Sequence, residues 1–147
     1  MTFGLDTVWI ANSAGNQVLG VDPVICQDPD EVSAGAGPIA VAVGGNSLWV
    51  ANFEADTVTR IDDPAGGAPV PNTFDVGDGP SDIVVDANGV WVVNKLDRNV
   101  MRLDPETGHV EATIDLGDEP QRIAAGAGAV WVTVRAPEEL ESGSTTP

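Results

Sequence analysis

The sequence predicts an all-β protein built from repeated four-stranded antiparallel units. Its tryptophans recur at a nearly constant interval, with successive ones 40, 42 and 40 residues apart. Short runs of β-branched residues alternate with turns rich in Gly and Pro, whereas amphipathic helical runs are missing. An interval of about 40 residues indicates an array of one supersecondary unit. The residues that set the interval are Trp9, Trp49, Trp91 and Trp131.

The two middle units show the whole pattern. In the second unit, residues 37–78, strands are expected at 38–43, 47–52, 57–62 and 73–76. In the third unit, residues 79–118, they are expected at 83–85, 90–94, 99–104 and 110–116. The turns Asn88-Gly89 and Thr107-Gly108 supply residue types that tolerate the positive φ of tight hairpins.

The outer units are shorter. Residues 1–36 begin close to the motif of a second strand, so this unit is expected to lack its leading strand. Residues 119–136 are expected to supply only the first two strands of the last unit. The sequence therefore predicts two complete units and two partial ones. The acidic, Ser/Thr-rich residues 137–147 are expected to form a disordered tail.

Four-stranded units at this interval are typical of β-propeller blades, and a single β-sandwich is the alternative. Residues 48–52 with 57–62, and residues 90–94 with 100–108, also resemble the YVTN-type β-propeller repeats of bacterial and archaeal surface and periplasmic proteins. Trp stands where that motif often has Tyr. The resemblance covers residues 7 to about 134. It implies a scaffold or binding surface. Because the outer units are incomplete, the array is expected to close into a ring with another copy or to form part of a larger propeller.

The charge balance excludes several classes of partner. Acidic residues outnumber basic ones 23 to 6, so a net charge of −17 disfavours nucleic acid and anionic membranes. No apolar run approaches the ~20 residues of a membrane-spanning helix. Residues 1–6 lack the basic and apolar regions of a signal peptide. The acidity suits a halophilic or secreted setting, and the resemblance favours an extracellular, periplasmic or cell-surface origin; a soluble acidic protein is the alternative.

Most repeated residues are expected to be structural. Each tryptophan alternates with small apolar neighbours, so it should project from one sheet face and pack against the next blade. Asn12, Asn52 and Asn94 end second strands, where an amide can fix the following turn or, alternatively, contact a ligand.

The axial mouth of the propeller is expected to be a solvated rim, with a ligand site as the alternative. The loops between blades and after the second strands open on one face, with Phe53 and Lys95 further from the axis. No calcium-loop pattern is present, so no metal or cofactor is predicted. The candidate ligand-binding residues are Asp82, Gln121, Arg122, Asn52 and Asn94.

The favoured function is a non-enzymatic interaction or assembly module that self-associates by inter-chain strand complementation. A closed homodimer is preferred over a filament, and a small ligand or peptide could bind at the mouth. The alternative is an enzyme similar to the virginiamycin B lyase-like propellers, using His109, nearby acids and a divalent cation. His109 is the one histidine in the sequence, and that family's catalytic histidine pattern is not matched.

Overall fold

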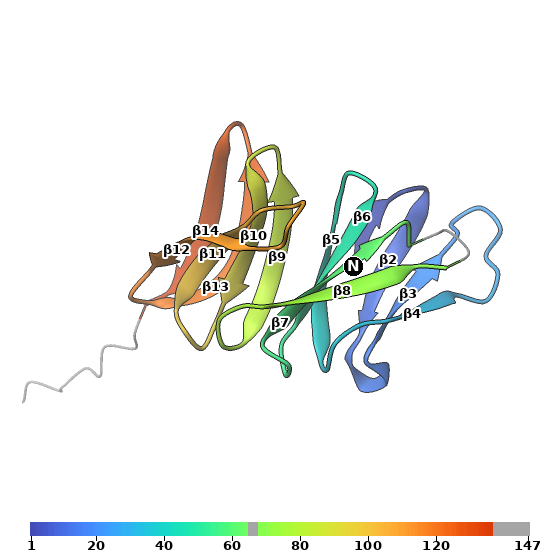
Figure 1. Ribbon diagram of the computed structural model, residues 1–147, viewed down its shortest axis with the longest axis horizontal. Helices are drawn as coiled ribbons and strands as arrows, with labels where there is room; N and C mark the ends of the chain where they lie inside the picture. The colour runs from blue at the N-terminus through green and yellow to red at the C-terminus, as the bar shows by residue number, and fades with distance from the viewer. Residues whose placement is uncertain (65–67, 137–147) are drawn as a thin grey trace, which may run out of the picture.

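The computed structural model describes residues 1–64 and 68–136, which form three four-stranded antiparallel sheets and one two-stranded sheet. Each sheet is one blade, and its strands follow chain order from the inner to the outer edge. Figure 1 shows the blades side by side, with blade 1 at one end of the row and blades 3 and 4 at the other. This arrangement is part of a β-propeller, as the sequence predicted. The predicted tail, residues 137–147, lies outside the described residues.

The strand bounds follow the repeat closely. Blade 1 consists of β1 (Thr2–Gly4), β2 (Thr7–Asn12), β3 (Gln17–Val21) and β4 (Asp30–Ser33), with the short 3-10 helix η1 (Ser13–Gly15) between β2 and β3. Blade 2 consists of β5 (Pro38–Gly44), β6 (Ser47–Asn52), β7 (Thr57–Asp62) and β8 (Val70–Asp75). Blade 3 consists of β9 (Pro80–Asp86), β10 (Gly89–Asn94), β11 (Asn99–Leu103) and β12 (Val110–Asp115). Blade 4 consists of β13 (Glu119–Gly126) and β14 (Ala129–Arg135).

The prediction that the first unit lacks its leading strand was wrong. The three residues of β1 pair with β2, with Thr2 opposite Trp9 and Gly4 opposite Thr7. Leu5 and Asp6 both adopt positive φ, near 54° and 57°, and so turn the chain within two residues. A Leu-Asp pair is not the usual sequence of such a turn, which is why the hairpin gave no sequence signal.

Apolar side chains between neighbouring blades form the core. Trp9 of blade 1 belongs to one buried cluster with Leu48 and Val50 of blade 2. Trp49 of blade 2 is joined in the same way to Val90 and Val92 of blade 3. Trp9 and Trp49 therefore each pack their own blade against the next one along the chain.

Backbone hydrogen bonds fix the connections between blades. In each four-stranded blade, a residue with positive φ after the second strand accepts a bond from the N–H of the segment that leads to the next blade. The acceptor and donor pairs are Asn16 with Ala34, Asp56 with Val76, and Arg98 with Leu116. Because these bonds hold the inter-blade segments, the start of each following inner strand is fixed in space. No helix in the described residues has the length and apolar character needed to cross a membrane.

Replacing Trp49 with Ala should lower the free energy of unfolding by about 3–5 kcal/mol, because the side chain leaves a large cavity between blades 2 and 3. Urea denaturation followed by circular dichroism measures this loss. The matched control is Trp131→Ala at protein concentrations where the chain is monomeric. Trp131 is 67% exposed, so its replacement should cost less than about 1 kcal/mol. Equal losses for the two variants would contradict the packing role of Trp49.

Candidate binding sites at the axial mouth and the open fourth blade

A polar pocket of about 320 Å³ lies where the inner strands begin. Ile39, Ser81 and Gln121 each follow the proline near the start of an inner strand. Phe53 and Lys95 each follow the asparagine that ends a second strand. Because these are equivalent positions of successive blades, the repeat itself brings them together at the mouth. Arg122 completes the lining.

Hydrogen-bond donors dominate the polar part of this pocket. Lys95 Nζ lies 3.2 Å from Glu119 Oε1, and Gln121 Nε2 donates to the same oxygen at 2.8 Å. The bond from Gln121 and then the contact with Lys95 lower the pKa of the Glu119 carboxyl. Ser81 Oγ is buried and has no hydrogen-bond partner among the described residues. The mouth can therefore offer donors and positive charge to an acidic or carbonyl-bearing ligand.

Of the predicted mouth residues, some line the pocket and others are engaged in contacts that position the strands. Gln121 and Arg122 line the pocket. Asp82 instead joins two blades, because its Oδ2 accepts the backbone N–H of Ile123 in β13 at 3.0 Å. Its other oxygen accepts the N–H of Ile83, also at 3.0 Å. Both carboxylate oxygens are thus engaged in positioning strands.

Asn52 and Asn94 are fully buried and are not part of the pocket lining. Asn52 Oδ1 accepts the N–H of Gly35 at 3.2 Å, and its amide nitrogen donates to Thr59 Oγ1 at 2.9 Å. Asn94 donates to Asn99 Oδ1 at 2.8 Å. The contacts of Asn52 favour the turn-fixing role over ligand contact, whereas Asn94 Oδ1 is buried and has no hydrogen-bond partner among the described residues. Neither side chain is part of the pocket lining, so we leave both out of the candidate site.

Four further lining residues were not among the predicted ligand contacts. The sequence placed Phe53 and Lys95 further from the axis and did not single out Ile39 or Ser81. A usable signal was present, since each stands one residue after a repeated Pro or Asn. The signal is weak because the residue types at these positions differ from blade to blade.

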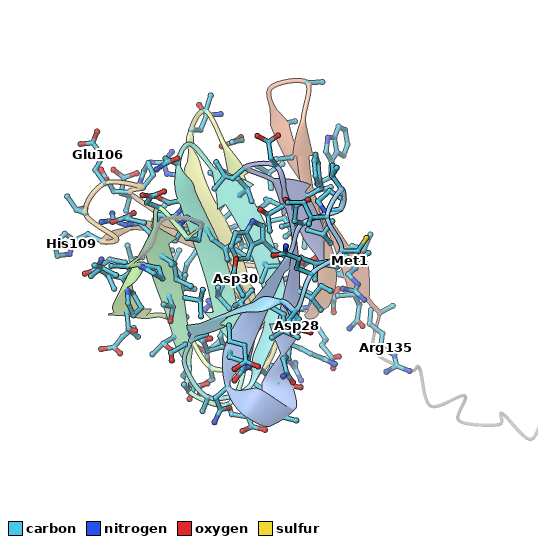
Figure 2. The ribbon with its side chains drawn as sticks, turned by 90° about the vertical axis from the view of Figure 1, so that its right-hand side faces the viewer. Met1, Asp28, Asp30, Glu106, His109 and Arg135 are labelled. Carbon is cyan, nitrogen blue, oxygen red and sulfur yellow. The ribbon has the colours of Figure 1, made fainter. Side chains whose placement is uncertain are left out.

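His109 lies far from the mouth. It follows the turn between β11 and β12, at the opposite strand ends, and it is exposed. Figure 2 shows His109 and Glu106 projecting from the outer edge, on the opposite side of the view from Arg135. Within residues 1–64 and 68–136, no group of three His, Cys, Asp or Glu side chains could hold a metal ion.

A second, apolar groove of about 470 Å³ lies beside blade 4. In the described residues β14 pairs only with β13, so blade 4 covers only part of the face of blade 3. The outer part of that face stays open, and Ile114 is 47% exposed there. The groove lining consists of Asn88, Trp91, Val100, Ile114, Leu116, Gly128, Val130 and Val132.

The two ends of the row of blades also expose large apolar side chains. On blade 4, Trp131 is 67% exposed, whereas the equivalent Trp9 and Trp49 are 0% and 1% exposed. On blade 1, Phe3 is 65% exposed at the other end of the row. Patches of this kind mark interaction surfaces more often than ordinary solvent-facing surface.

Comparison with solved structures identifies the fold. The chain superposes on hydrazine synthase of Kuenenia stuttgartiensis with a TM-score of 0.73 and 26% identity, over 80% of this chain and 35% of that one. For a catalytically inactive virginiamycin B lyase from Staphylococcus aureus with quinupristin, the TM-score is 0.75 with 20% identity, over 87% and 45% of the two chains. For BamB from Moraxella catarrhalis, the TM-score is 0.69 with 12% identity, over 90% of this chain and 39% of that one.

The chain thus spans less than half the length of these structures. The sequence matches no family model. It also has no match among curated proteins. The similarity to solved structures agrees with the sheet topology, and the described residues form three four-stranded blades and one two-stranded blade of a β-propeller.

The Glu119 carboxyl should titrate below the range of an unperturbed glutamate, and Gln121→Ala should raise its pKa toward that range. Because the folded-state pKa is lowered, the contacts stabilise the fold above the unfolded-state pKa. This contribution is lost as the pH falls through the folded-state value. Carboxyl chemical shifts measured against pH test the change. Gln17→Ala, which removes a glutamine in β3, serves as the control and should leave Glu119 unchanged.

Proposed function

We propose that this chain is a non-enzymatic β-propeller interaction and assembly module, and that its preferred partner is a second copy of itself. The exposure of Trp131 is the observation that supports this most directly. Trp9 and Trp49 occupy equivalent positions and are buried against the following blade, whereas Trp131 is 67% exposed. Buried tryptophans are among the side chains that contribute most to association.

Blade 1 offers the kind of surface on which such a tryptophan packs. In blade 2, Leu48 and Val50 are fully buried in the cluster that contains Trp9. The equivalent residues of blade 1 are Val8 and Ile10, which are only half-buried. A second copy that places this face against Trp131 would repeat the packing between blades 1 and 2.

Two copies arranged head to tail can close into one ring around the propeller axis. Each copy contributes three four-stranded blades and one two-stranded blade. A strand from a partner then completes the two-stranded blade, which is the strand complementation we propose. We favour the closed dimer over a filament because closure covers both end faces of every copy.

The net charge of the chain determines the ionic strength at which two copies associate. Each chain carries a net charge of −17, so two copies repel one another at low ionic strength. At about 1 M salt the Debye length falls to about 3 Å, and this repulsion is screened. Apolar contacts such as those of Trp131 are not weakened by salt, so association should strengthen as salt rises.

The mouth adds a second binding function within the same proposal. Lys95 and Arg122 line the pocket in a chain that has 6 cationic residues in all. Arg122 forms no ion pair within 4.0 Å in the described parts of the chain. A small ligand or peptide with an acidic group would pair with these cations, while Ile39 and Phe53 contact its apolar part.

Light scattering in low and in molar salt tests the assembly. In molar salt we expect twice the 15.1 kDa mass of the single chain, with Trp131 fluorescence shifted to shorter wavelength. Trp131→Ala should restore the single-chain mass under the same conditions. Val70→Ala, which alters an exposed apolar residue in β8 of the inner blade 2, should leave the dimer intact. A fully β-structured chain that stays monomeric at every salt concentration would refute the proposal.

A further inference from the structure

We propose that the open edge of β14 and the adjoining groove bind an extended partner segment with the pattern Val-x-Arg-Ile/Leu. This inference rests on the proposed interaction function and names the chemistry of the strand that completes blade 4. The segment runs antiparallel to β14. Its valine lies opposite Thr133, its arginine opposite Trp131 and its Ile or Leu opposite Val130.

The backbone of β14 supplies the first part of the site. The equivalent strands β2, β6 and β10 each pair with a neighbour on both sides. Among the described residues, β14 pairs on one side alone. Its second edge therefore presents backbone N–H and C=O groups that an added strand can satisfy.

The groove supplies an apolar floor beneath the added strand. Its lining includes Val100, Ile114 and Leu116 of blade 3. In blade 2 the equivalent of Ile114 is Phe74, since each pairs with the equivalent valine of the third strand. Phe74 packs in one cluster with Met101 and Leu103 of β11 in the following blade. A third strand in blade 4 would cover Ile114 as β11 covers Phe74.

The arginine of the proposed pattern is inferred from the residue that lies opposite the tryptophan on the neighbouring third strand in blades 2 and 3. Arg60 lies opposite Trp49 in the register of β6 and β7, with its guanidinium carbon 5.9 Å from the ring centroid. Arg102 lies opposite Trp91 in β10 and β11, at 5.8 Å. Trp131 has the equivalent place in β14 and is exposed. An arginine on the added strand would restore this cation–π contact.

The neighbours of these arginines define the two aliphatic positions. Ile61 and Leu103, which directly follow Arg60 and Arg102, are fully buried. Val58 and Val100, two residues before the same arginines, are also buried. Ile61 and Leu103 pack toward the preceding blade, so the Ile or Leu of a segment in blade 4 would be buried against blade 3. Val58 and Val100 pack toward the following blade, so the valine of that segment would lie on the same face as Trp131.

Charge favours a cationic segment. The net charge of −17 attracts a basic peptide. The sequence after Arg135 contains no Arg or Lys, so the pattern is not found there. Within the chain it occurs as Val58-Thr59-Arg60-Ile61 and Val100-Met101-Arg102-Leu103, and both copies are already built into β7 and β11.

The test uses a synthetic peptide with the sequence of residues 99–104 and the full-length chain. Binding is measured by tryptophan fluorescence, and strand addition by slower amide exchange along β14. The peptide with Arg102→Ala should bind at least about threefold more weakly, as expected for the loss of one cation–π contact. Chain variant Ile114→Lys places a charge in the groove and should abolish binding.

Val110→Lys is the matched control, because Val110 lies on the same strand, is 42% exposed and is not part of the groove lining. It should bind the peptide like the unaltered chain. The inference is overturned if the peptide does not bind, if its arginine makes no difference, or if Ile114→Lys binds normally. Peptide binding is measured in low salt, where the chain is monomeric and the edge of β14 is free. Failure to bind there, in a chain that dimerises in molar salt, would overturn this inference alone, whereas peptide binding by a chain that stays monomeric at every salt concentration would overturn self-association alone.

Discussion

The packing of Trp9 and Trp49 against the following blade is the interaction on which the structure depends. Trp9 and Trp49 are buried between sheets that share no strand hydrogen bonds with one another. The inter-blade contact is therefore mostly apolar and nearest-neighbour, as in other repeat proteins. The same contact, left incomplete at Trp131, is the basis of the proposed assembly.

Polar groups refine this apolar framework by fixing how consecutive blades are joined. Asn52 holds the segment that enters blade 2, and Asp82 ties β9 to the N–H of Ile123 in β13. The oxygens of both side chains accept backbone N–H groups, and the amide nitrogen of Asn52 donates to the hydroxyls of Thr57 and Thr59. The lining of the mouth can consequently vary, since Ile39, Ser81 and Gln121 occupy one repeated position with three different chemistries.

The two proposed binding surfaces have different physical characters. The mouth is polar and lined by Lys95 and Arg122, which suits a small acidic group. The groove beside β14 is apolar and adjoins an open strand edge, which suits an extended peptide. A strongly acidic chain can use both, because a basic partner is attracted to the molecule while local cations at the mouth accept an acid.

The sequence alone determined the blade type, the position of most strands and the burial of Trp9 and Trp49, because a 40-residue period and alternating apolar residues are local properties. It did not reveal β1, whose turn uses Leu5 and Asp6 at positive φ without the usual turn residues. It also did not show that Gln121 lines the mouth whereas the Asp82 carboxylate accepts a hydrogen bond from the next blade. Only the tertiary structure decided this, because the outcome depends on which backbone N–H of another blade lies within reach of each side chain.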